Sequence, residues 1–250
     1  MHLPFKERKT AAKAVEPVQA QVPQLRDAEL AAVYYGERLG GDFYDFIRVS
    51  PTRAVFGLLD VAGRSEQNRA IVAAAQETFR TESVRLLAGD DVNEADAMTE
   101  LCLKLNHTVL EVAGEVRSCP AFAGCYNEEM GITCYFNAGH TPALLYDRKG
   151  TTELPATGLP LGLFSHATCD SFIAALPPEA ALVLVSRGVV EAKSKGAEFG
   201  LAGVKAMLAH ADTQNARGLC LTVIDGMRQF MGTPPTHNDM TVLSLVRSAG

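Results

Sequence analysis

Four polar side chains stand beside short β-prone runs of the chain. Asp42 begins one such run, Asp60 ends the next, and the pair Asn238-Asp239 precedes the last. Strand ends of a β-sandwich bring distant positions to one rim, where carboxylate and amide oxygens bind hard divalent cations such as Mg²⁺ or Mn²⁺. Isolated aspartates at strand ends are more often turn formers than ligands. The spacing alone therefore allows a metal site without establishing one.

The elements that must position these residues are short strands and a few helices. One run, Val55 to Leu59, is apolar on both faces, which is typical of a strand sandwiched between two layers. Apolar stripes at helical spacing predict two helices, one through Ile71, Ala75 and Phe79 and one through Met98, Leu101, Leu105, Val109 and Val112. Asp91 or Asn93 is expected to cap the second. Further patterns predict strands at 31–35, 43–49, 54–59, 121–126, 132–137, 144–147, 171–176, 181–185 and 240–246, and helices at 201–211 and 216–231.

The order strands, helices, strands, helices, strand favours an α+β fold over alternating βαβ units. We expect a four-layer α/β/β/α sandwich with two mostly antiparallel central sheets flanked by helices. Residues 1–25, rich in Ala, Lys, Gln and Pro, are expected to form a mobile arm, and residues 26–250 a single domain.

Composition excludes several classes of protein. Net charge is −6 and the basic residues are scattered, so no broad positive face for nucleic acid is expected. The six cysteines form no CxxC pair and suit buried thiols in a reducing compartment rather than a structural zinc site. Neither a signal peptide nor an apolar run of about 18 residues occurs, so no membrane association is expected and the predicted location is cytoplasmic.

Five motifs follow one another over most of the chain: GGDFYDF at 40–46, LLDVAG at 58–63, FNAGHTPALL at 136–145, GLPLG at 158–162 and SRGVVEAKSKGAEFG at 186–200. Together they resemble the metal-dependent serine/threonine protein phosphatases of type 2C, in the bacterial SpoIIE-like branch. The Gly-Gly-Asp loop also occurs in diguanylate cyclases, but Phe43 stands here where their chemistry uses an acidic residue.

The resemblance implies a two-metal site that hydrolyses phosphoserine. Two divalent ions lower the pKa of a shared water from about 15.7 toward 7 and stabilise the attacking and leaving oxygens. Asp60 would be the bridging ligand, the Val61 carbonyl an additional one, and Asp42 a ligand or the holder of metal-bound water. These are the implied catalytic and metal-binding residues.

Two substitutions weaken that expectation. The family places aspartates where this chain has Arg187 and Asn238. Two aspartates, one arginine and one asparagine carry a formal charge of −1, whereas four aspartates carry −4. We therefore expect one Mn²⁺ or Mg²⁺ at Asp60 rather than two, or none. Arg64 and Ser65, which replace a family His-Gly, point the same way.

Several roles stay open. Asp239 replaces the lost ligand if its turn shifts register, and Asn238 still offers a carbonyl oxygen. Arg187 either binds a phosphate or fills the vacated position through a salt bridge to Asp60 or Asp42. His140 is expected to make a structural hydrogen bond, and Glu191 to order a turn or lie on the surface.

The sequence thus predicts a phosphatase-fold signalling regulator with weakened or lost phosphoserine hydrolysis. The alternative is an active Mn²⁺- or Mg²⁺-dependent phosphoserine/phosphothreonine phosphatase. By resemblance, its partner would be a phosphorylated regulatory protein of the anti-anti-sigma type or another signalling protein. The helices between 66 and 113 offer a surface for a partner or a homodimer, and a purely scaffolding role is a third reading.

Overall fold

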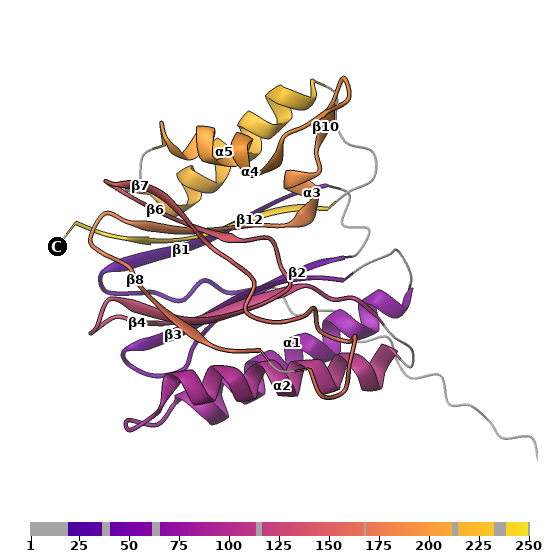
Figure 1. Ribbon diagram of the computed structural model, residues 1–250. Helices are drawn as coiled ribbons and strands as arrows, with labels where there is room; N and C mark the ends of the chain where they lie inside the picture. The colour runs from indigo at the N-terminus through magenta and orange to yellow at the C-terminus, as the bar shows by residue number, and fades with distance from the viewer. Residues whose placement is uncertain are drawn as a thin grey trace, which may run out of the picture.

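Two five-stranded antiparallel sheets, stacked face to face, form the centre of the molecule, and helices cover both outer faces (Figure 1). The computed structural model describes residues 20–36, 41–61, 66–113, 117–167, 169–211, 215–232 and 239–249. The strands are β1 (Ala28–Tyr35), β2 (Asp42–Arg48), β3 (Arg53–Asp60), β4 (Ala121–Asn127), β5 (Ile132–Ala138), β6 (Ala143–Asp147), β7 (Gly150–Leu154), β8 (Phe172–Ala175), β9 (Ala181–Val185), β10 (Lys193–Ser194), β11 (Ala197–Glu198) and β12 (Met240–Arg247). The helices are α1 (Glu66–Leu87), α2 (Glu94–Ala113), α3 (Arg187–Val190), α4 (Gly200–Leu208) and α5 (Ala216–Met231).

The first sheet has the order β1-β12-β9-β6-β7 and the second the order β2-β3-β4-β5-β8. In Figure 1, α4 and α5 lie over the first sheet and α1 and α2 over the second. This is the four-layer α/β/β/α arrangement with antiparallel sheets that the sequence predicts. Among the described helices, none combines the length and hydrophobicity that crossing a bilayer requires.

Three apolar clusters fill the three interfaces between the four layers. The run 54–59 of β3 is apolar on both faces because alternate residues of a strand face opposite sides, and both sides of this strand are covered. Val55 and Leu59 pack with the helix-side cluster of α1 and α2, whereas Phe56 and Leu58 pack between the sheets. The third cluster joins α5 to the first sheet. The prediction that this run is sandwiched between two layers is confirmed.

The helical stripes are buried with one exception. Ile71, Ala75 and Phe79 of α1 are buried, as are Met98, Leu101, Leu105 and Val109 of α2. Val112 is 40% exposed, so its assignment to the buried stripe is wrong. The side chain of Asn93 accepts hydrogen bonds from the backbone N–H groups of Ala95 (3.1 Å) and Asp96 (3.3 Å), which identifies it as the cap of α2.

Some features differ from the sequence-based expectation. Strand β7, the β10–β11 hairpin and the one-turn helix α3 are additional elements. The hairpin and α3 are too short for periodicity to reveal, and β7, with the sequence Gly-Thr-Thr-Glu-Leu, lacks a clear apolar pattern. Residues 20–25 were assigned to the arm, yet the Gln24 carbonyl accepts a hydrogen bond from Arg48, and Leu25 packs against the core between the sheets. Residues 1–19, the rest of the predicted arm, lie outside the described part of the chain. All six cysteines are buried free thiols, as predicted.

Candidate active site

Asp42 and Asp60 face each other at one end of the sandwich. The antiparallel register of β2 and β3 pairs them directly, so the turn between the strands is at the opposite end. Beyond this pair the Val61 N–H donates to the Gly41 carbonyl over 2.8 Å. A Cβ on Gly41 would lie 2.9 Å from the Val61 oxygen, too close for any side chain. Glycine before Asp42 therefore lets the two strand ends approach.

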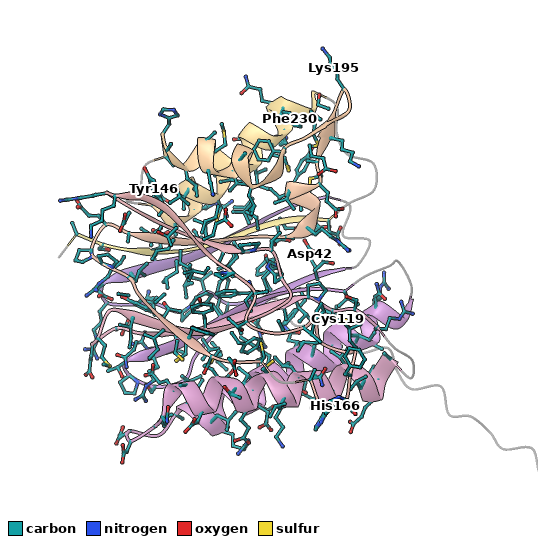
Figure 2. All side chains as sticks on the ribbon, viewed as in Figure 1. Asp42, Cys119, Tyr146, His166, Lys195 and Phe230 are labelled. Carbon is teal, nitrogen blue, oxygen red and sulfur yellow. The ribbon has the colours of Figure 1, made fainter. Side chains whose placement is uncertain are left out.

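Strands β9 and β12 of the first sheet supply the facing residues at this end of the sandwich. The hydroxyl of Thr241 donates to Asp42 Oδ2 over 2.7 Å, and the Thr241 N–H donates to the Ser186 hydroxyl over 3.0 Å. A Cβ on Gly188 would lie only 2.1 Å from the Asp239 carbonyl oxygen, so glycine lets α3 pack on the start of β12. Figure 2 shows Asp42 at this end of the sandwich, between the two sheets. Residues almost 200 positions apart thus meet at one rim.

Arg187, the first residue of α3, reaches across to Asp60. Its Nε lies 3.4 Å from Asp60 Oδ2, and while the Asp60 side chain is buried, half of the Arg187 side chain is exposed. The guanidinium of Arg187 therefore occupies one side of the Asp60 carboxylate, and the exposed half of the Arg187 side chain is open to solvent. Of the two salt-bridge partners considered from the sequence, Asp60 is the one that the structure pairs with Arg187.

The carboxylate of Asp239 is held from both sheets, by Tyr34 of β1 and by Gly41, which precedes β2. The Tyr34 hydroxyl donates to Asp239 Oδ1, and the Gly41 N–H donates to Asp239 Oδ2 over 2.9 Å. Tyr34 is placed for this by the antiparallel pairing of β1 with β12, in which it lies opposite Thr241. Both oxygens of Asp239 thus serve as hydrogen-bond acceptors at the edge of the site.

The pKa values of Asp42 and Asp60 are raised because both carboxyl groups are buried and lie near other negative charges. Burial raises the pKa of Asp42 to about 7, with the neighbouring charge of Asp60 as the second cause, while hydrogen bonds from Thr241 and Ser186 oppose the shift. Burial also raises the pKa of Asp60, and the charge of Arg187 opposes this. The charges of Glu191 and Asp239 add to the rise of the Asp60 pKa. The site disfavours further negative charge unless a cation compensates.

Several oxygen donors of the rim already have partners within the protein. Asp60 has a guanidinium at 3.4 Å, and both oxygens of Asp239 accept hydrogen bonds from protein groups. The Val61 carbonyl accepts from Asn68 Nδ2 at 3.5 Å. In the part of the chain that the structure describes, no three His, Cys, Asp or Glu side chains gather in a metal-binding cluster. A divalent ion at Asp60 would compete with these contacts.

Four other positions identified from the sequence lie outside the described residues: Gly40, Arg64, Ser65 and Asn238. Glu191, whose charge reaches Asp60, is the C-cap of α3 and so lies near the site.

His140 is buried, and its Nδ1 lies 3.1 Å from the Thr141 carbonyl, which agrees with the predicted structural hydrogen bond. Sequence reasoning missed three members of the rim. Ser186 stands in the motif at 186–200 and Thr241 follows the Asn238-Asp239 pair by two positions, so both could have been found there, whereas Tyr34 carries no sequence signal.

Comparisons with known proteins agree with this architecture. The family model described as Stage II sporulation protein E (SpoIIE) matches residues 50–248. The phosphoserine phosphatase RsbP of Bacillus subtilis (strain 168) is 27% identical over 184 residues, which cover 72% of this chain and 44% of RsbP. This chain thus spans less than half the length of that relative.

Two solved structures show the same fold. The RsbU and RsbW domains of Rv1364c from Mycobacterium tuberculosis superpose with a TM-score of 0.73 at 22% identity, covering 89% of this chain and 62% of that one. RsbX in complex with magnesium gives a TM-score of 0.64 at 13% identity, covering 92% of this chain and 100% of that one. At these identities the likeness concerns the fold: two antiparallel sheets with flanking helices.

Proposed function

The chain belongs to the SpoIIE family of PP2C-type phosphatase domains, and from that premise we propose that it is a signalling regulator whose phosphoserine hydrolysis is weakened or lost. The observation that carries the proposal is the Arg187–Asp60 ion pair at 3.4 Å. A guanidinium at this distance repels a divalent ion at the same carboxylate. Asp60 is the residue on which a bridged pair of ions would depend, so the substitution acts on the centre of the reaction.

The metal content we propose is one Mn²⁺ or Mg²⁺ at Asp60, or none. Asp42, Asp60 and the Val61 carbonyl are the remaining oxygen donors, and Asn238 and Asp239 are the further candidates. When bound, such an ion would polarise a phosphoryl oxygen or activate water. Ser186 and Thr241 would orient Asp42 whether or not an ion is present, because their hydrogen bonds are made within the protein.

Arg187 gives the site a second capability. Its side chain is half exposed, so the guanidinium pairs with Asp60 on one side and is open to a ligand on the other. A guanidinium fork matches the oxygens of a phosphate. We propose that the site holds a phosphorylated side chain of a partner protein without rapid turnover. A regulator of this kind retains its phosphorylated partner instead of releasing a dephosphorylated one.

The partner we propose is a phosphorylated regulatory protein of the anti-anti-sigma type. The support is the family and the likeness to a protein named phosphoserine phosphatase and to RsbU and RsbW domains. Six buried free thiols support a reducing, cytoplasmic setting for the interaction with this partner.

Hydrolysis of a phosphoserine peptide in the presence of Mn²⁺ tests the proposal. We expect the wild-type rate to equal that of Asp60→Asn, because the ion pair already disables the carboxylate. Binding of the same peptide is expected in the wild type and at least tenfold weaker in Arg187→Ala. A Mn²⁺-dependent rate that Asp60→Asn abolishes would instead establish the active phosphatase, and equal peptide binding by Arg187→Ala would remove the phosphate-holding role.

A further inference from the structure

Strand β8 is an edge strand with large apolar side chains exposed on both of its faces. It pairs with β5 on one side and ends the second sheet. Phe172 is 52% exposed and Ile173 is 62% exposed, and these neighbours point to opposite faces of the sheet. An edge strand presents unpaired backbone N–H and C=O groups that are a template for another strand. Here the template is also apolar.

The core between the two sheets reaches solvent at this strand. Phe122 stacks between Phe56 and Tyr135, with ring centroids 6.4 Å and 5.3 Å away, and Tyr135 lies 6.4 Å from Phe172. The first three rings are buried and the last is half exposed. The row of aromatic rings across β3, β4, β5 and β8 therefore stops at an uncovered edge rather than at a polar boundary.

The other outer strands of the two sheets are protected by charge. β1 contains Glu29, β7 contains Glu153, and β2 contains Arg48. The sequence of β8, Phe-Ile-Ala-Ala, has no charged residue. Charged side chains on edge strands oppose pairing with another chain. β8 lacks this protection, as expected of a strand that pairs in solution.

We propose that β8 is a dimer interface, at which a second copy of this chain adds its own β8 in antiparallel orientation. Two-fold symmetry requires directly opposite residues to share a face, and the register that we propose among those it allows places Ile173 against Ile173 of the second copy. The same register sets Phe172 opposite Ala174 of the second copy, so each large ring meets a small side chain. The sequence is thus complementary to itself, and pairing joins the two five-stranded sheets edge to edge.

Two further exposed apolar residues lie near the ends of β8. Met130, 66% exposed, precedes Gly131, whose carbonyl accepts from the Leu176 N–H just after β8. Leu159, 53% exposed, follows Gly158, which bridges Cys169 just before β8. An antiparallel partner brings the Met130 end of one copy to the Leu159 end of the other. Four paired residues alone fall short of the roughly 1,000 Å² that a specific interface buries, so the proposal requires side chains beyond β8 to join the contact.

Cysteine cross-linking tests the register directly. Opposite residues of antiparallel strands have Cα atoms about 4.5–5.5 Å apart, within the range of a disulfide. Cys134 lies directly opposite residue 173 on β5, so the test uses a Cys134→Ala background, in which no disulfide can form within one copy. Ile173→Cys in this background should give a covalent dimer under mild oxidation, since the other five native thiols are buried. Val84→Cys in the same background, 44% exposed on α1, is the matched control and should remain monomeric on a non-reducing gel. A cross-link from position 84 but not 173 would place the dimer at the helices and overturn the proposal.

Light scattering gives the second measurement. The wild type should show twice its 26.8 kDa chain mass. Ile173→Lys should raise the dimer dissociation constant at least tenfold, because two ammonium groups then lie opposite each other, while Leu221→Lys on α5 should leave it unchanged. A wild-type monomer at micromolar concentration, or a dimer insensitive to Ile173→Lys, would refute the interface. None of these outcomes depends on phosphoserine hydrolysis or on Arg187.

Discussion

Replacing Arg187 by alanine should strengthen divalent-metal binding at Asp60. The Arg187 Nε lies 3.4 Å from Asp60 Oδ2, so an ion on that carboxylate would sit about 4 Å from a positive charge. Alanine removes the charge and leaves both Asp42 and Asp60 in place. The change therefore isolates the electrostatic cost that we assign to the guanidinium.

The magnitude follows from Coulomb's law with solvent screening. At 4 Å, two unit charges interact by about 4 kcal/mol at an effective dielectric of 20 and by about 1 kcal/mol in water. Because half of the Arg187 side chain is exposed, the lower limit is the better guide. A dication doubles it, which gives about 2 kcal/mol. That corresponds to a dissociation constant about 30-fold tighter than in the wild type.

Calorimetric titration with Mn²⁺ measures this change. Arg187→Lys keeps the positive charge and is the control, with affinity expected within about threefold of the wild type. Asp60→Asn in the Arg187→Ala background should abolish the gained binding. Arg187→Asp combined with Asn238→Asp should bind a second ion. If Arg187→Ala binds Mn²⁺ no better than Arg187→Lys, the guanidinium is not what excludes the metal and the reasoning fails.

Three further predictions concern stability. Arg80→Leu should destabilise the fold by about 3 kcal/mol in urea unfolding, because it removes the 2.6 Å partner of the fully buried Asp45 carboxylate; Asp45→Asn in the same background should restore most of the loss. Burial lowers the pKa of His140 to about 4, so the unfolded state binds a proton from pH 6.5 downward and the native state does not. Stability should therefore fall by up to about 3 kcal/mol between pH 6.5 and 4, and His140→Gln should flatten this part of the pH profile; an equal slope in both proteins would contradict the cause. Asn93→Ala should cost about 1 kcal/mol through loss of the α2 cap, whereas Asn93→Ser should cost little; equal losses would show that capping is not the reason.

Much of the fold is predictable because each layer imposes a period on the sequence. The apolar run Val55 to Leu59 identified a strand with cores on both sides, and the i, i+4, i+8 spacing of Ile71, Ala75 and Phe79 identified a helix covering one of them. Val112, three residues after Val109, is 40% exposed, whereas the next residue, Ala113, is buried in the same cluster as Val109. The buried stripe of α2 therefore continues at i+4 rather than i+3, and periodicity allows both spacings.

The site is predictable only as far as its motifs extend. Asp42, Asp60 and Arg187 were identified from sequence, and the structure brings them together. Tyr34 was not, because its contact with Asp239 spans 205 positions and depends on the register of β1 with β12. A tyrosine at the end of an apolar strand is an ordinary core residue by its pattern. Only the folded chain shows that it holds a carboxylate.

The hydrogen bonds of Asp239 compete with the role of replacement metal ligand that the sequence leaves open for it. Successive residues of an extended chain point to opposite sides, so a carboxylate moved by one position is directed elsewhere. Its oxygens are engaged by the Tyr34 hydroxyl and the Gly41 N–H, and turning toward Asp60 would leave both donors to find new acceptors in a partly buried site. The negative charge of Asp239 is therefore retained in the neighbourhood, where it raises the pKa values of Asp42 and Asp60. The positive charge of Arg187 opposes this rise at Asp60 from within the chain.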